Sequence, residues 1–128
     1  MGRYRTGEGL GTDMSTSSRI AITPTDLHVV VRVGDETVAD SYAPVLLEEK
    51  GLPARYYLPR HDVRTDLLRP TDHRTTCPWK GEASYWSLEV GGRAYENLVW
   101  CYETPIPEAK LIAGLLCFYN DRVQLTVD

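Results

Sequence analysis

Short runs of β-branched and apolar residues, separated by brief turn signals, recur along most of this chain. Residues 27–33 read Leu-His-Val-Val-Val-Arg-Val, and Gly34-Asp35 separates them from a second run. Residues 83–90 alternate between two faces, and Gly91-Gly92 follows them at once. Alternation with a period of two and Gly-containing two-residue turns are typical of antiparallel hairpins. The sequence therefore predicts a mainly β domain of antiparallel sheets, with strands at residues 27–33, 36–39, 44–47, 54–58, 83–90, 93–102, 115–119 and 123–127.

Two stretches favour short helical structure instead. Residues 59–68 begin with a proline, and residues 108–113 follow two prolines and end before Gly114. The polar residues 69–74 are expected to be a loop. We expect the last two strands to form a hairpin around Asn120-Asp121. Alternation alone does not distinguish a sandwich, a barrel or a tent.

The length of the chain indicates one domain. A chain of 128 residues can bury one core and is short for two. No run of about 18 apolar residues occurs, which argues against a membrane span. Residues 1–18 are rich in Gly, Ser, Thr and Arg and lack the apolar core of a secretory signal. We therefore expect a flexible leader at 1–18, with Met14 as an alternative start, a single domain at 19–128 and a cytoplasmic location.

The cysteines and histidines are not spaced as metal ligands usually are. Cys77, Cys101 and Cys117 form no close pair, and the three histidines form no HxH or HExxH motif. A structural zinc site needs about four ligands, usually in paired knuckles, and a disulfide framework needs an even count. No Gly-rich dinucleotide or phosphate loop is present either. We expect no metal, no zinc and no cofactor.

Charge is distributed unevenly along the chain. The net charge is −4, yet residues 50–80 hold seven basic and three acidic residues and so carry +4. A local basic segment on an acidic protein suits a small anionic ligand better than duplex nucleic acid, which needs a broad basic face. An ordinary solvated loop with surface arginines would give the same composition. We expect a small-molecule partner, no nucleic acid and no membrane partner.

Several residues in and near this segment could form a ligand site. Lys80 lies in a Pro-Trp-Lys-Gly turn and could bind an anion or act as a base. Arg55 and Tyr57 share one face of a predicted strand, and we expect Glu48 to pair with Arg55. Each of these residues could instead have a purely structural role. The candidate ligand-binding residues are Glu48, Arg55, Tyr57, Arg64, Lys80 and Tyr85.

Three segments carry a resemblance to a known family. They are Leu-Pro-Ala-Arg-Tyr-Tyr-Leu-Pro at 52–59, Asp-Val-Arg at 62–64 and Thr-Cys-Pro-Trp-Lys-Gly-Glu-Ala-Ser-Tyr-Trp at 76–86. With them, the chain from about residue 20 onward resembles the bacterial and fungal family called domain of unknown function 427. The resemblance implies a β-tent fold, known from zinc-carrying modules and methionine sulfoxide reductases, but this chain lacks their paired cysteines. It implies no reaction, and the Asp-x-Asp platform usual for nucleotidyl transfer is missing here.

Three classes of function remain open on these grounds. The first is binding of a small anionic or polar-aromatic ligand. The second is a tailoring enzyme in a biosynthetic pathway, with Lys80 or Tyr85 as acid or base. The third is a protein-interaction module or homodimer that uses Trp79, Tyr56 and Tyr102 as an aromatic surface. Cys77 is a weaker candidate, a nucleophile that His73 would have to activate.

Overall fold

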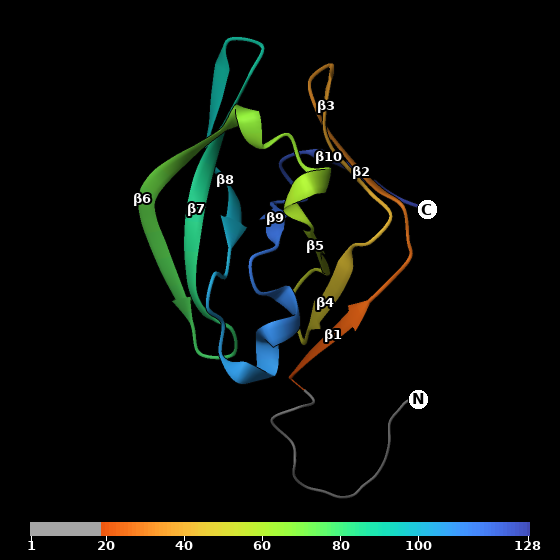
Figure 1. The fold of residues 1–128 in the computed structure, drawn as a ribbon, viewed down its shortest axis with the longest axis vertical. Helices are drawn as coiled ribbons and strands as arrows, with labels where there is room; N and C mark the ends of the chain where they lie inside the picture. Colours follow the sequence, from red (N-terminus) through yellow and green to blue (C-terminus); the bar gives the residue numbers. More distant parts are fainter. Residues whose placement is uncertain (1–18) are drawn as a thin grey trace, which may run out of the picture.

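Two antiparallel sheets make up most of residues 19–128, the part of the chain that the computed structural model describes (Figure 1). The predicted leader at 1–18 lies outside the described residues. In order across the larger, seven-stranded sheet, the strands are β1 (Ile20–Pro24), β4 (Val45–Glu49), β5 (Arg55–Leu58), β9 (Leu116–Phe118), β8 (Arg93–Cys101), β7 (Gly81–Val90) and β6 (Leu68–Cys77). The smaller sheet contains β10 (Gln124–Val127), β2 (Val29–Val33) and β3 (Glu36–Ser41). The prediction of a mainly β fold with antiparallel sheets is confirmed.

Short 3-10 turns connect parts of these sheets. They are η2 (Arg60–Asp62), η3 (Thr65–Leu67) and η4 (Pro107–Ile112). Figure 1 shows η4 between the two wings of the larger sheet, which we define as β1–β4–β5 on one side and β6–β7–β8 on the other. Strand β9 joins the wings at the centre. No helix in residues 19–128 has the length and apolar character needed to cross a membrane.

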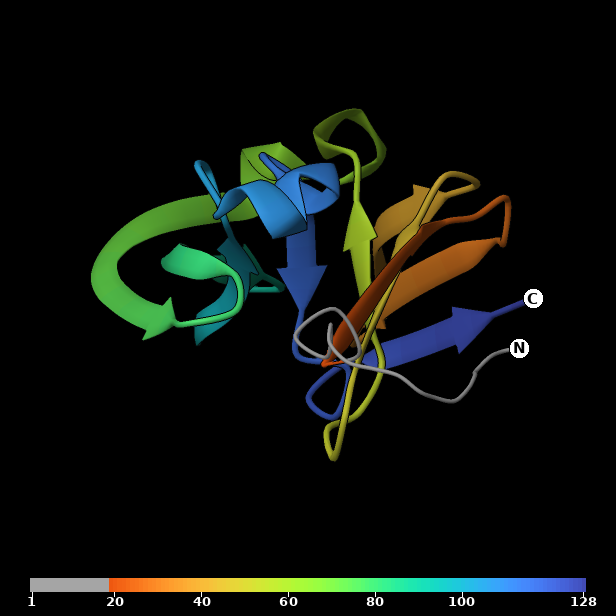
Figure 2. The ribbon, with the colours of Figure 1, turned by 90° about the horizontal axis from the view of Figure 1, so that it is seen from below.

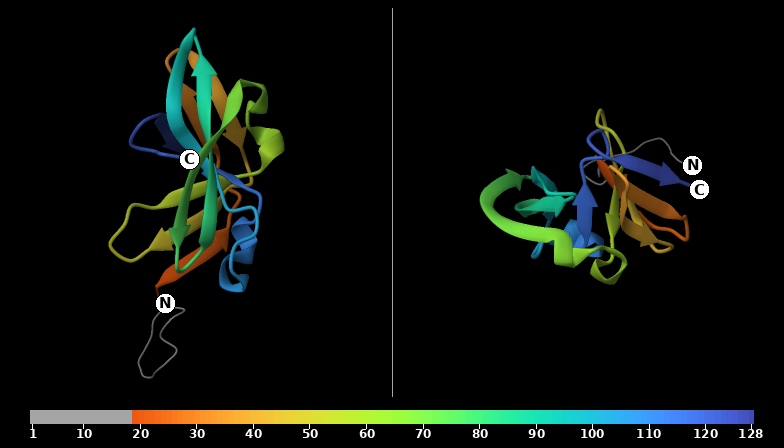
Figure 3. Two further views of the ribbon diagram at one scale, coloured as in Figure 1. Left: turned by 90° about the vertical axis from the view of Figure 1, so that its left-hand side faces the viewer. Right: turned by 90° about the horizontal axis from the view of Figure 1, so that it is seen from above.

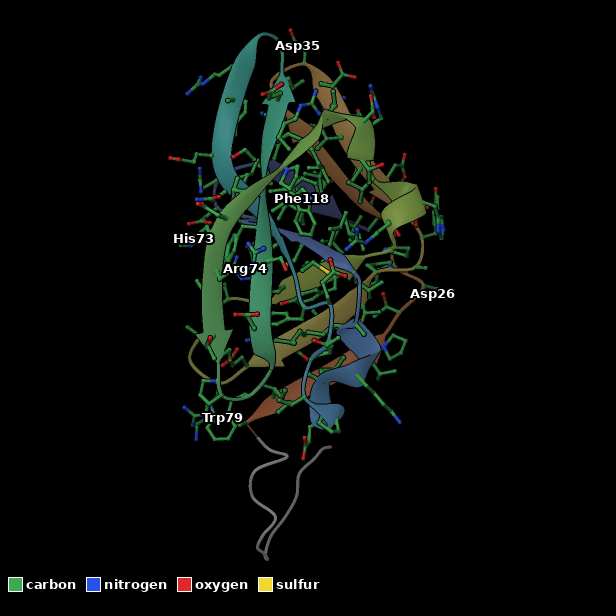
Figure 4. All side chains as sticks on the ribbon, turned by 60° about the vertical axis from the view of Figure 1, so that its left-hand side comes forward. Asp26, Asp35, His73, Arg74, Trp79 and Phe118 are labelled. Atoms are coloured by element: carbon green, nitrogen blue, oxygen red, sulfur yellow. The ribbon has the colours of Figure 1, made fainter. Side chains whose placement is uncertain are left out.

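The central strands of the larger sheet are buried on both faces. Successive side chains of a strand point to opposite faces, so Leu58 and Tyr57 belong to different apolar clusters. One cluster lies between the two sheets and includes Phe118, which Figure 4 shows in the interior. The other lies on the opposite face of the larger sheet and includes Trp100 together with Ile112 of η4. This second cluster surrounds the candidate site.

The two ends of the molecule carry different hairpin turns. Figure 2 shows β6 (green) and β10 (blue) on opposite sides. Figure 3 shows the tips of the β2–β3 and β7–β8 hairpins at one end. The β6–β7 turn lies at the other end, as the positions of Trp79 and Asp35 in Figure 4 show. The candidate site lies toward the Trp79 end.

Two local expectations were wrong. The expected loop at 69–74 is part of β6, which pairs with β7 from Leu68 to Cys77 with a register shift between Pro70 and Arg74. Its residues are mostly exposed, because β6 is an edge strand, and its polar composition resembles that of a loop. The expected last hairpin is also absent from the described chain, because β9 pairs with β5 and β8 whereas β10 pairs with β2.

Candidate functional site

A cavity of about 180 Å³ opens on the second apolar cluster, between the two wings of the larger sheet. We call it the Lys80 pocket. Its walls combine three charged side chains with five aromatic ones and two residues of the β4–β5 loop. The lining residues are Glu49, Arg55, Lys80, Tyr57, Tyr85, Trp100, Tyr102, Tyr119, Leu52 and Pro53. Such a mixture of apolar walls and a few charged groups is typical of small-molecule sites.

The backbone of the β6–β7 turn fixes the position of Lys80. The Lys80 amide donates to the Cys77 carbonyl at 3.2 Å, and the Lys80 carbonyl accepts from the Ile106 amide at 2.9 Å. Gly81 follows with a φ of +119°, a conformation that strongly favours glycine. A Cβ at Gly81 would lie only 3.3 Å from Pro105 Cα, so the turn packs tightly against the loop before η4.

Lys80 and Glu49 form a nearly buried ion pair across the pocket. Lys80 Nζ donates to Glu49 Oε1 at 2.5 Å, and their side chains are only 11% and 10% exposed. Lys80 Nζ also lies 6.0 Å from the centroid of the Tyr102 ring. Glu49 ends β4 and Lys80 precedes β7, so the pair connects the two wings. Burial of either charge alone would be costly, and the pairing offsets that cost.

Arg55 is held in the pocket by neutral partners. Its Nη1 donates to Asn120 Oδ1, and Asn120 Nδ2 in turn donates to the Ala54 carbonyl at 3.0 Å. The guanidinium carbon lies 5.3 Å from the ring centroid of Trp100 and 5.5 Å from that of Tyr119. Among the described residues, no carboxylate forms an ion pair with Arg55. Because Lys80 and Glu49 offset each other, Arg55 leaves the pocket with one net positive charge.

Burial keeps three tyrosine hydroxyls of the pocket, those of Tyr57, Tyr102 and Tyr119, in their neutral form near neutral pH. Tyr57 Oη accepts from Trp100 Nε1 at 3.0 Å, and burial raises the pKa of Tyr57 far above its usual value. Burial likewise raises the pKa of Tyr102. Burial, followed by hydrogen bonding with Tyr85, raises the pKa of Tyr119 to about 12. These phenols can therefore donate and accept hydrogen bonds, but none of the three is suited to act as a phenolate base.

The structure brings four of the six candidate residues together. Arg55, Tyr57, Lys80 and Tyr85 all line the Lys80 pocket. Tyr85 is almost fully buried, and its hydroxyl lies 2.9 Å from Thr75 Oγ1.

Glu48 and Arg64 lie elsewhere. Glu48 is exposed, because it occupies the position of β4 next to Glu49 and neighbouring side chains of a strand point to opposite faces. The expected pairing of Glu48 with Arg55 is therefore wrong: Arg55 contacts Asn120 instead. Arg64 lines an open groove of about 540 Å³, and its ion pairs with Glu36 and Asp66 are both 2.9 Å long.

Sequence reasoning missed several walls of the pocket. They are Glu49, Trp100, Tyr119, the neighbouring Asn120, and Tyr102, which was expected only in an aromatic surface. For Glu49 a usable pattern existed, since buried Leu47 fixes which positions of β4 point inward. For the others, β9 and the last four residues of β8 are apolar on both faces, so alternation does not show which face holds a cavity.

The expected aromatic surface is divided. Tyr102 is buried in the pocket wall, with 5% of its surface exposed. Trp79 is half-buried, and the Arg19 guanidinium lies 4.9 Å from its ring centroid. Tyr56 packs against the cluster between the sheets. Three residues placed in this way do not offer one common face to a partner.

The remaining candidate chemistry gains no support from the side-chain positions. His73, the suggested activator of Cys77, packs against the Tyr85 ring with centroids 4.5 Å apart. Burial raises the pKa of the Cys101 and Cys117 thiols. Within residues 19–128, no three His, Cys, Asp or Glu side chains gather closely enough to hold a metal ion.

Comparison with known protein families identifies the one to which this chain belongs. A family model described as "Domain of unknown function (DUF427)" matches residues 21–128, which confirms the resemblance inferred from the three sequence segments. No curated protein matches the chain. The family description names no ligand and no reaction, so any function has to be inferred from the pocket itself.

Proposed function

The chain belongs to the family of the domain of unknown function 427, and we propose that it binds a small carboxylate-bearing ligand in the Lys80 pocket. One observation carries the proposal: Arg55 is the cation of this pocket that no carboxylate pairs with among the described residues. A partly desolvated guanidinium with neutral neighbours attracts an anion strongly. A ligand carboxylate would balance the net charge of the pocket.

The setting of Arg55 favours a planar anion. A guanidinium carries five N–H donors in a fixed plane, and its bond to Asn120 uses only one of them. The Trp100 and Tyr119 rings beside it restrict its orientation, so less conformational entropy is lost when a ligand binds. An Asn120 amide is also easier to displace than a carboxylate, because no charge pair is broken.

The size and walls of the pocket limit the ligand. A volume of 180 Å³ equals the liquid volume of about six water molecules. It suits a small acid or the acidic end of a larger molecule. The aromatic walls favour an unsaturated or aromatic group beside the carboxylate. A ligand of this kind would fall within the anionic or polar-aromatic class that the sequence led us to expect.

Two arginines allow a matched test. Calorimetric or NMR titration with benzoate and with pyruvate should show binding to the wild type. Arg55→Gln should weaken this binding by at least about tenfold, the equivalent of one charge-assisted hydrogen bond. Arg64→Gln is the control, because Arg64 lies in the separate groove with its own carboxylate partners. Equal weakening by both variants, or by neither, would contradict the proposal.

A further inference from the structure

We propose that Lys80 forms a reversible Schiff base with the carbonyl group of a small 2-oxo carboxylic acid. The inference rests on the proposed function, because Arg55 would hold the carboxylate of the same molecule. It deepens that function by assigning separate roles to the two cations of the pocket. Arg55 binds the acid group, and Lys80 reacts with the neighbouring carbonyl carbon.

The position of Lys80 distinguishes it from the other lysines. The chain contains three, and Lys50 and Lys110 are exposed whereas Lys80 is buried to 9% exposure among aromatic walls. Amines in such desolvated pockets are suited to covalent chemistry with carbonyl groups.

Glu49 supplies the proton acceptor that the step needs. Its Oε1 lies 2.5 Å from Lys80 Nζ, within reach for direct proton transfer. In the proposed step the carboxylate accepts the proton that Lys80 gives up as its nitrogen attacks the carbonyl carbon. The nearby tyrosines are less suited to this role, because burial keeps Tyr57 and Tyr102 protonated through their raised pKa values.

The step balances without an outside oxidant or reductant. The Lys80 nitrogen lone pair attacks the carbonyl carbon, and the C=O π electrons move to oxygen, which takes a proton from Glu49. The nitrogen of this carbinolamine returns one proton to Glu49, which passes it to the hydroxyl group. The C–O bond then breaks and water leaves. The product is a protonated imine, which pairs with the Glu49 carboxylate as the ammonium group did before.

The two cations also limit the length of the substrate. Lys80 and Arg55 line one cavity of about 180 Å³, so a molecule that contacts both must be short. In a 2-oxo acid the carbonyl carbon is bonded directly to the carboxylate carbon. A simple aldehyde would lack the carboxylate that Arg55 binds. A hydroxy acid would lack the carbonyl group that Lys80 attacks.

Borohydride reduction of the full chain with pyruvate tests the proposal. Reduction converts the imine to a stable secondary amine, which peptide mass spectrometry assigns to one lysine. We expect modification of Lys80 at least about tenfold faster than that of Lys50 or Lys110, since the bound carbonyl lies beside the amine. The exposed lysines report non-specific reaction in the same sample. Equal modification of all three would overturn the inference.

Two further probes separate the failure of this inference from that of the proposed function. Lactate should bind, as judged by NMR shifts of pocket residues, and give no adduct. Propanal should react at Lys80 at least about tenfold more slowly than pyruvate, because it lacks the carboxylate. Binding of pyruvate and lactate without a Lys80 adduct would overturn the Schiff base alone. Absence of both binding and adduct would overturn the proposed function as well.

Discussion

Gly81 is the residue whose replacement most directly tests the turn that presents Lys80. Its φ of +119° is strained for any other residue, and an added Cβ would lie 3.3 Å from Pro105 Cα and 3.4 Å from the Ile106 nitrogen. Both neighbours are backbone atoms of one loop and cannot rotate away. We expect Gly81→Ala to lower the free energy of unfolding by about 2–3 kcal/mol.

Urea denaturation followed by tryptophan fluorescence measures this change. Gly34→Ala is the matched control, because Gly34 has a φ of +59° and no atom lies within 4 Å of an added Cβ. The control should lose only about 1 kcal/mol, the cost of the left-handed conformation itself. If both substitutions lower the free energy of unfolding by the same amount, the close packing against the Pro105 loop does not contribute to stability.

At the level of elements, the Lys80–Glu49 pair connects β4 of one wing with the β6–β7 turn of the other. Lys80→Met would leave the Glu49 carboxylate buried without its partner, and we expect a loss of about 3 kcal/mol in unfolding free energy. The double variant Lys80→Met/Glu49→Gln should be more stable than Lys80→Met, because no unpaired charge is then buried.

A surface pair between the same two types of charge provides the comparison. Arg69 and Glu89 connect β6 and β7 at 3.3 Å, and both side chains are about half exposed. Arg69→Met should cost less than about 1 kcal/mol in the same denaturation experiment. A loss for Lys80→Met as small as this would show that the buried pair does not hold the wings together.

The elements also show how far sequence patterns reach. In each half of residues 83–90 the apolar side chains alternate with polar ones and share one face of the strand. This alternation is why β7 could be predicted. β6 could not, because an exposed edge strand such as 69–74 carries no apolar alternation. The pairing of β10 with β2 joins residues far apart in the chain, which no local turn signal encodes. Local patterns predicted the elements better than they predicted the partners.

The candidate site follows the same rule. Arg55, Tyr57, Lys80 and Tyr85 could be selected because each is a polar or charged group in an otherwise apolar or tightly turning segment. Glu49 lines the pocket and the predicted Glu48 does not, because one position along a strand reverses the face. That the pocket lies between two wings depends on long-range pairing, which a single sequence does not show.

On the scale of the whole molecule, the cluster of buried phenols makes stability sensitive to alkali. The unfolded-state pKa of tyrosine is about 10. Burial raises the folded-state pKa of Tyr57 above this value, and that of Tyr119 to about 12. A raised folded-state pKa of an acid contributes stability below about pH 10, and this contribution is lost as the pH rises further.

We therefore expect the free energy of unfolding to fall above about pH 10, by about 1.4 kcal/mol per pH unit from Tyr57 alone. Urea midpoints measured at steps of pH, with phenolate absorbance recorded in parallel, test this. In the Tyr57→Phe variant the free energy of unfolding should fall less steeply as the pH rises. Ionisation of all tyrosines in the native state near pH 10 would contradict the expectation.

The position of β9 at the centre of the larger sheet has a consequence for synthesis on the ribosome. β5 pairs on one side with β4, which precedes it closely, but on the other side with β9, which leaves the ribosome about sixty residues later. Until then β5 and β8 both have an unpaired edge. During synthesis, binding of chaperones or rapid folding after release would keep those edges from pairing with other chains.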